Sequence, residues 1–152
     1  MTDFATLTLT RTLKASPARV FDALTNPKAR AIWAGPDVDS VVEIVDQPDP
    51  APGVRETAQV GPAGNPYVTA HTDWIVMEAP ERLIYAETLV AESETLAVTL
   101  AIAELSAAET GTQLDLHLDL TSFVGEEMRG EVESGWTHAI DSLVKLVETA
   151  NV

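Results

Sequence analysis

A stripe of apolar residues near the C-terminus has the spacing of one long amphipathic helix. Its members recur at three- and four-residue intervals between residues 125 and 149: Val132, Trp136, Ile140, Leu143 and Val147. This period fits a helix and does not fit a strand. More than a hundred residues of mostly strand-like pattern precede it. The chain is therefore expected to form one large sheet covered by one helix, with room for a small molecule between them.

Alternation of polar and apolar residues predicts the strands. In residues 4–13 leucines occupy one face and threonines the other, as in a half-buried strand. Six more strands are predicted at residues 38–45, 54–60, 67–77, 83–90, 96–105 and 112–120. Turn-forming segments join them and no helix-length segment separates them, so the sheet is expected to be antiparallel.

Two short helices are predicted between the first strand and the rest of the sheet. Ser16-Pro17 and Asn26-Pro27 each place a capping side chain before a proline at the first helical position. Gly35-Pro36 ends the second helix just after Trp33. The length and this order of elements predict a single α+β domain over residues 1–152.

The composition of the chain excludes some classes of partner and predicts its cellular compartment. Lys and Arg number 9 against 24 Asp and Glu, which gives a formal net charge of -15 at pH 7. Such an acidic protein repels phosphate backbones and anionic lipid surfaces, so neither a nucleic-acid partner nor membrane insertion is expected. Cysteine is absent, which excludes disulfides and thiolate metal sites. No leading apolar run follows Met1, and a cytoplasmic protein is predicted.

Short motifs along nearly the whole chain resemble one known family. They are the segment 11–21, Thr25-Asn26-Pro27 with Trp33, Gly53, the segment 78–83, Gly111-Thr112, and Gly135-Trp136 with Leu143. Together with the element order, they resemble the START-like or helix-grip superfamily, the Bet v allergen-like fold. Within it, they resemble proteins similar to the C-terminal domain of the heat-shock-protein ATPase activator. Ile32-Trp33 and the turn at residues 49–54 depart from the family's usual motifs.

The resemblance implies a curved antiparallel sheet of about seven strands, two short helices after the first strand, and a long C-terminal helix over the sheet. It also implies a cavity of lipid or metabolite size between the helix and the sheet. Relatives in this superfamily include chaperone activators, polyketide cyclases and antibiotic self-resistance proteins, and the fold alone does not choose among them.

The best candidate site lies in the strand at residues 83–90. Alternation places Leu83, Tyr85 and Glu87 on one face. If Leu83 is in the core, then a phenol and a carboxylate also point inward. The pair could hydrogen-bond a polar ligand atom, or act as acid and base if burial raises the pKa of Glu87. The alternative is that Glu87 lies beyond the helix, at a hydrated end of the sheet.

The preceding strand supplies a second candidate. His71, Asp73 and Met77 share one face of a regular strand, and Met77 aligns with an apolar core position of the family. We therefore expect His71 and Asp73 at the cavity mouth, where a His/Asp pair could serve as a base and its orienter or as two metal ligands, although no third ligand is evident. Trp74 is expected on the outer face. The alternative is an exposed, polar strand end.

Trp33 and Arg11 have two interpretations each. Trp33 could gate the groove or anchor the core. Arg11, on the leucine face of the first strand, could bind a ligand's acid group or pair with a buried carboxylate. Leu116, Trp136 and Ile140 complete the apolar walls that are predicted around the ligand, together with Met77 and Leu83.

No complete catalytic motif occurs in the sequence. It has neither a Gly-x-Ser-x-Gly elbow nor a Gly-rich phosphate loop, and its three histidines lack metal-ligand spacing. We therefore predict no metal and no cofactor. The predicted function is binding of a small, largely hydrophobic molecule, such as a lipid or polyketide. Two alternatives are a protein-interaction module that stimulates a chaperone ATPase, whose partner the sequence does not identify, and a cyclase- or hydrolase-type enzyme.

Overall fold

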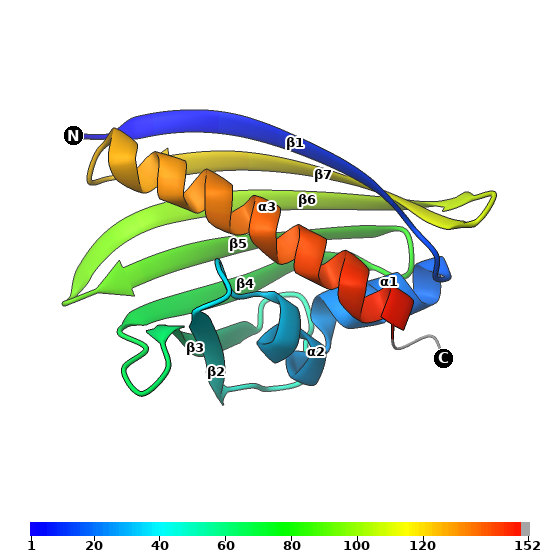
Figure 1. Ribbon diagram of the computed structural model, residues 1–152, viewed down its shortest axis with the longest axis horizontal. Helices are drawn as coiled ribbons and strands as arrows, with labels where there is room; N and C mark the ends of the chain where they lie inside the picture. Colours follow the sequence, from blue (N-terminus) through cyan, green and yellow to red (C-terminus); the bar gives the residue numbers. More distant parts are fainter. Residues whose placement is uncertain (150–152) are drawn as a thin grey trace.

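A seven-stranded antiparallel sheet forms the body of the protein in a computed structural model, which describes residues 1–149 (Figure 1). The strands lie in the order β1-β7-β6-β5-β4-β3-β2. Their bounds are β1 Asp3–Leu13, β2 Ser40–Asp46, β3 Arg55–Pro62, β4 Val68–Glu78, β5 Arg82–Ala91, β6 Glu94–Ala108 and β7 Gly111–Ser122. Every pairing is antiparallel, so the predicted class and sheet are confirmed.

The helices begin where the sequence predicts. In α1 (Pro17–Thr25) the Ser16 side chain accepts a hydrogen bond from the Arg19 amide. In α2 (Pro27–Trp33) the Asn26 side chain accepts from the amides of Lys28 and Ala29. These contacts satisfy N–H groups that a first helical turn leaves unpaired.

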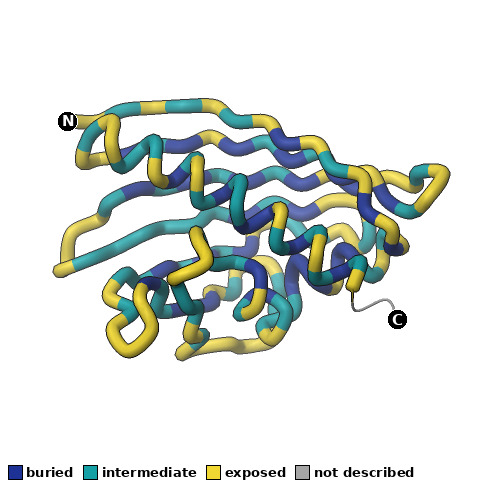
Figure 2. The backbone as a smooth tube through the Cα atoms, viewed as in Figure 1, coloured by how far each residue is buried: buried dark blue, intermediate teal, exposed yellow. Residues whose placement is uncertain are grey.

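The long helix α3 (Glu126–Thr149) crosses one face of the sheet (Figure 1). It buries the predicted stripe, including Trp136 and Ile140, against that face. Buried positions alternate with more exposed ones along the strands, as Figure 2 shows. Leu83 and Leu116 are among the buried core residues. The face toward α3 is therefore the inner, apolar face, and the opposite face is solvated.

A β-bulge in β4 changes which residues face inward. Trp74 pairs with Tyr85 and Val76 pairs with Ile84, so Ile75 has no partner in β5. An extra residue in one strand reverses the alternation beyond it. Trp74 is accordingly buried, at 2% exposure, while Met77 still packs against the core on the other side of the bulge. The expectation that Trp74 lies on the outer face was wrong for this reason.

None of the helices in residues 1–149 is long and apolar enough to cross a membrane.

Candidate functional site

Polar side chains form one row across the inner face of the sheet. Glu56 of β3 pairs with Thr72 of β4, Thr72 pairs with Glu87 of β5, and Glu87 pairs with Thr99 of β6. Glu56, Thr72 and Thr99 are buried, and Glu87 is partly exposed. Since the two glutamates flank Thr72, they stand two strands apart, at roughly 10 Å. Two carboxylates thus share a surface that is otherwise largely apolar.

The guanidinium of Arg30 lies over this row. Its Nε is 3.0 Å from both carboxylate oxygens of Glu56. Its Nη1 donates to the carbonyl of Leu24 at 3.2 Å, and its Nη2 donates to Oγ1 of Thr72 at 3.0 Å. Although burial opposes its charge, the Glu56 carboxylate raises the pKa of Arg30. The ion pair is buried on both sides, so it ties α2 to β3 and β4.

Three aromatic rings surround the same guanidinium. Its central carbon lies 5.0 Å from the ring centre of Trp74 and 5.5 Å from those of Trp33 and Tyr85. These separations are within the range of cation–π attraction. The indole of Trp136 continues the cluster, with its ring 6.1 Å from that of Tyr85. A charged group therefore sits inside an aromatic cage rather than in water.

Burial near the guanidinium shifts the pKa values of two acids, Glu87 and Tyr85. Burial raises the pKa of Glu87 from 4.5 to about 7, with the charge of Arg30 lowering it and the charge of Glu56 raising it. Burial also raises the pKa of Tyr85 to about 12, against the charge of Arg30. Near neutral pH Glu87 is therefore shared between its acid and carboxylate forms, while Tyr85 keeps its proton.

One buried donor in the cluster is unused. The Nε1 of Trp136 is inaccessible to solvent and has no hydrogen-bond partner in the structure. By contrast, the indole N–H of Trp33 donates to the carbonyl of Ala23 at 2.8 Å. A buried N–H without an acceptor is unfavourable by about 1–3 kcal/mol. An acceptor brought by a ligand would remove that penalty.

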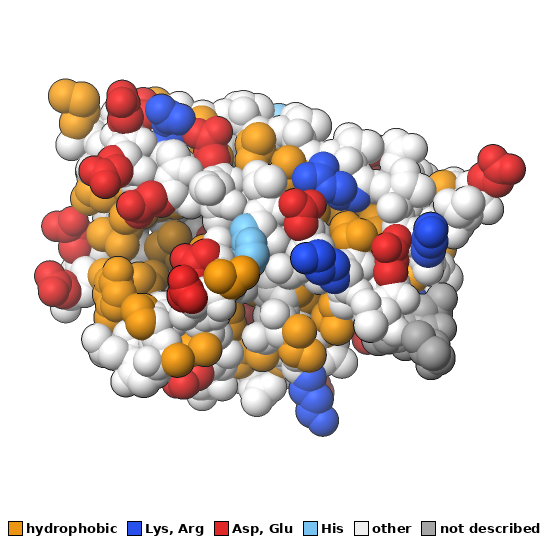
Figure 3. Space-filling view, in the orientation of Figure 1, with side chains coloured by type: hydrophobic (Ala, Val, Ile, Leu, Met, Phe, Trp, Pro, Cys, Tyr) orange, Lys and Arg blue, Asp and Glu red, His pale blue; other side chains and the backbone are white. Residues whose placement is uncertain are grey.

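The inner face is open at one end. Figure 3 shows hydrophobic side chains around a hollow beside the N-terminal half of α3. At this end of the inner face Leu89 of β5 and Met128 of α3 pack on the core while remaining only partly buried. Glu87 precedes Leu89 on the same face. Hydrophobic side chains thus surround the hollow, and along the inner face of β5 Glu87 lies between Leu89 and Tyr85 of the aromatic cage.

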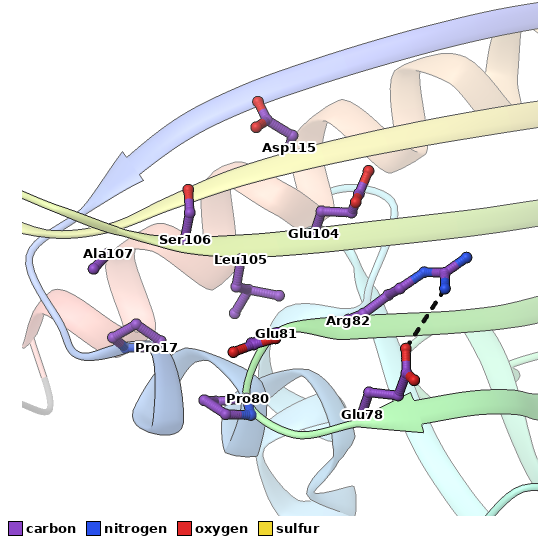
Figure 4. A pocket seen from close by; sticks show the side chains of 10 residues that line it. All are labelled: Pro17, Glu78, Pro80, Glu81, Arg82, Glu104, Leu105, Ser106, Ala107 and Asp115. Atoms are coloured by element: carbon purple, nitrogen blue, oxygen red, sulfur yellow. Dashed lines mark ion pairs between the residues drawn. The ribbon is translucent and has the colours of Figure 1, made fainter.

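Two other depressions lie elsewhere. The larger, of about 800 Å³, is found where the β4–β5 turn approaches the start of α1, and its lining includes Glu81, Glu104 and Asp115 (Figure 4). The smaller, of about 460 Å³, lies along β1 and β7 near Phe4. Neither is between α3 and the sheet. An enclosed hydrophobic cavity at that place therefore stays a prediction.

The structure brings most of the predicted residues together. Leu83 and Tyr85 are buried on the inner face, and Glu87 follows them with the same orientation. Leu116, Trp136 and Ile140 are also in the core, and Met77 packs against it. The predicted inward orientation of the phenol and the carboxylate is confirmed. Their role in ligand binding is a separate proposal.

Three predicted residues, His71, Asp73 and Arg11, lie outside this group. His71 precedes the bulge and faces outward, 3.1 Å from Oγ1 of Thr57, so its expected place at the cavity mouth was wrong. Asp73 likewise pairs with Arg55, at 2.7 Å. Arg11 forms the expected structural ion pair, with Asp141 of α3 at 3.1 Å, but the side chain of Asp141 is 56% exposed, so the expectation of a buried partner was wrong. Trp33 is buried with its N–H satisfied, as a core anchor would be.

Sequence reasoning missed Arg30, Glu56 and Thr72. The signals were present. Arg30 precedes Trp33 by three residues, which places both on one face of α2. Glu56 alternates with Ala58 and Val60, so it belongs to an apolar strand face. A charge at an apolar position in each of two neighbouring elements is the pattern of a buried ion pair.

The fold recurs in several solved structures. A protein of Rhizobium leguminosarum is 23% identical, with a TM-score of 0.81 and coverage of 98% of this chain and 97% of that one. A protein of Chromobacterium violaceum is 20% identical, with a TM-score of 0.76 and coverage of 94% and 97%. A protein of Nitrosomonas europaea is 23% identical, with a TM-score of 0.74 and coverage of 96% of each chain. These likenesses show the fold alone.

No protein with curated annotation matches the sequence. The family model described as "Activator of Hsp90 ATPase homolog 1-like protein" matches residues 14–148, which includes α1, α2, all of β2–β7, the whole polar row and all of α3 except its last residue. The chain therefore belongs to the Hsp90 ATPase activator homolog 1-like family, within the START-like superfamily.

Proposed function

We propose that the protein binds a small, largely hydrophobic molecule in the hollow beside the N-terminal half of α3. The observation that carries this proposal is the unpartnered Nε1 of Trp136, a buried donor next to Tyr85. Protein interiors rarely leave such a donor unused. The partly exposed Glu87 adds a polar group whose charge is poorly compensated. Apolar walls with a few convergent polar groups are typical of small-molecule sites.

Intrinsic fluorescence reports on this site directly. All three tryptophans of the chain, Trp33, Trp74 and Trp136, belong to the cluster around Arg30 and Tyr85. Titration with a panel of aromatic polyketides, long-chain ketones and fatty acids should therefore change the emission when a ligand enters. A panel without a single binder would count against the proposal.

Tyr85→Phe tests the polar contact. It deletes one hydroxyl and keeps the ring, so a ligand that hydrogen-bonds there should bind more weakly by about 0.5–1.5 kcal/mol. Tyr67→Phe is the matched control, since Tyr67 is the other tyrosine of the chain and is 61% exposed. Equal affinity of both variants would remove Tyr85 from the binding site.

The family description favours a second function, stimulation of an Hsp90-type chaperone ATPase. The strongly acidic chain, with a formal net charge of -15, would suit a basic surface on that partner. Steady-state ATPase assays with the chaperone from the same organism would test it. An increase that weakens with added salt is expected, and an unchanged rate over a range of protein concentrations would reject this function.

A further inference from the structure

The charged groups near the hollow determine which ligand charge the site accepts. This inference rests on the proposed function, which places the ligand in the hollow. Arg30 is the one cation that residues 1–149 bury. Each of its three nitrogens already has a partner, in Glu56, Leu24 or Thr72. Aromatic rings surround the guanidinium as well. Because the charge of Arg30 is already paired with Glu56, an acidic ligand meets no unpaired buried cation in residues 1–149 to replace the water that it loses.

Glu87 decides the charge of the surroundings. Toward it, α2 contributes the charge of Arg30, which acts on Glu87 more strongly, and β3 contributes that of Glu56; the formal charges of this pair sum to zero. Its own strand contributes Tyr85, which stays neutral. Its direct neighbours on β4 and β6, Thr72 and Thr99, do not ionise, and the residues that α3 buries are uncharged. Once Glu87 ionises, the site carries a net negative charge.

The polar groups at the site offer donors. Trp136 Nε1 is an unused donor, Tyr85 retains its hydroxyl proton, and Glu87 is a donor in its acid form. We infer that the site selects a neutral molecule with an acceptor oxygen, a ketone or an alcohol on an apolar chain, and that Glu87 excludes the carboxylic acid of the same size.

The protonation state of Glu87 should then control the affinity for a ketone. Because the pKa of Glu87 is about 7, its donor form predominates at pH 6 and falls to about a tenth at pH 8. The apparent affinity scales with the fraction of competent protein, so binding of a ketone should weaken about tenfold between these pH values. Glutamine at this position keeps a donor and carries no charge, so it should abolish that change.

Isothermal titration calorimetry with 2-undecanone and decanoate tests the inference. Both ligands carry a nine-carbon chain on a carbonyl carbon. The ketone has a methyl group where decanoate has a negatively charged oxygen. At pH 8 the wild type should bind the ketone at least tenfold more tightly than decanoate. Glu87→Gln should bind the ketone at pH 8 as tightly as the wild type does at pH 6. In this variant the affinity for decanoate should also come closer to the affinity for the ketone. Glu104→Gln, on the exposed outer face, should change neither value.

The outcomes separate the two proposals. If decanoate binds the wild type as tightly as 2-undecanone at pH 8, the selection rule is overturned while the binding function stands. A ketone affinity that is equal at pH 6 and pH 8 in the wild type overturns the role of Glu87. If the wild type binds neither molecule at either pH, the proposed binding function itself fails.

Discussion

Replacing Glu87 by glutamine is expected to stabilise the protein above neutral pH. Glu87 lies on the inner face among buried side chains, and burial raises its pKa from 4.5 to about 7. A carboxyl whose pKa is raised by folding favours the native state when it is protonated, and this contribution is lost as the pH rises through the native pKa. The wild type therefore loses stability between about pH 4.5 and pH 7 in a way that the glutamine variant does not.

The size of the effect follows from the two pKa values. Each tenfold change in proton affinity is worth about 1.4 kcal/mol. The variant should therefore exceed the wild type by roughly 3 kcal/mol in unfolding free energy at pH 8, and by less than about 1 kcal/mol at pH 5. For a domain of this length 3 kcal/mol corresponds to roughly 6–12 °C in melting temperature.

Urea denaturation at pH 5 and pH 8 measures the difference in unfolding free energy between Glu87→Gln and the wild type. The other carboxylates contribute equally to both proteins, so subtracting one curve from the other isolates Glu87. Glu104→Gln, an exposed carboxylate on the outer face, should give differences close to zero at both values. A variant whose gain is the same at pH 5 and pH 8, or absent at pH 8, would refute the assigned burial of the charge.

Further variants test the cluster and the helix. Arg30→Met should lower the unfolding free energy, measured by urea denaturation, by about 3–5 kcal/mol, because it leaves Glu56 buried without its cation. Adding Glu56→Leu to this variant should restore much of the lost stability. Trp136→Ala should lower unfolding free energy by roughly 3–5 kcal/mol, and an unchanged melt would contradict its place in the core. Gly130→Ala should stabilise α3 by about 1 kcal/mol, since an added Cβ meets nothing within 4 Å. Gly135→Ala should gain less, because its Cβ would lie 3.0 Å from that of Pro36.

Local sequence determined the elements and part of the site. Capping residues, turn segments and the two hydrophobic periods each act over a few residues, so the strands, both short helices and the long helix could be predicted. The two-residue period of a strand also predicted the orientation of Tyr85 and Glu87 correctly, because β5 alternates regularly from Leu83 to Leu89. The family motifs added the topology.

Tertiary structure decided what alternation alone could not. The bulge at Ile75 reverses the faces of β4, and no turn residue marks it in the sequence, so His71 and Trp74 were assigned to the wrong sides. The buried pair of Arg30 and Glu56 joins residues 26 positions apart. Their contact depends on how α2 packs against β3. The pKa of Glu87 is raised first by burial on the inner face, and the charges of Arg30 and Glu56 then shift it in opposite directions. Patterns fix which way a side chain points within its own element, whereas its partners and its charge state come from the elements that surround it.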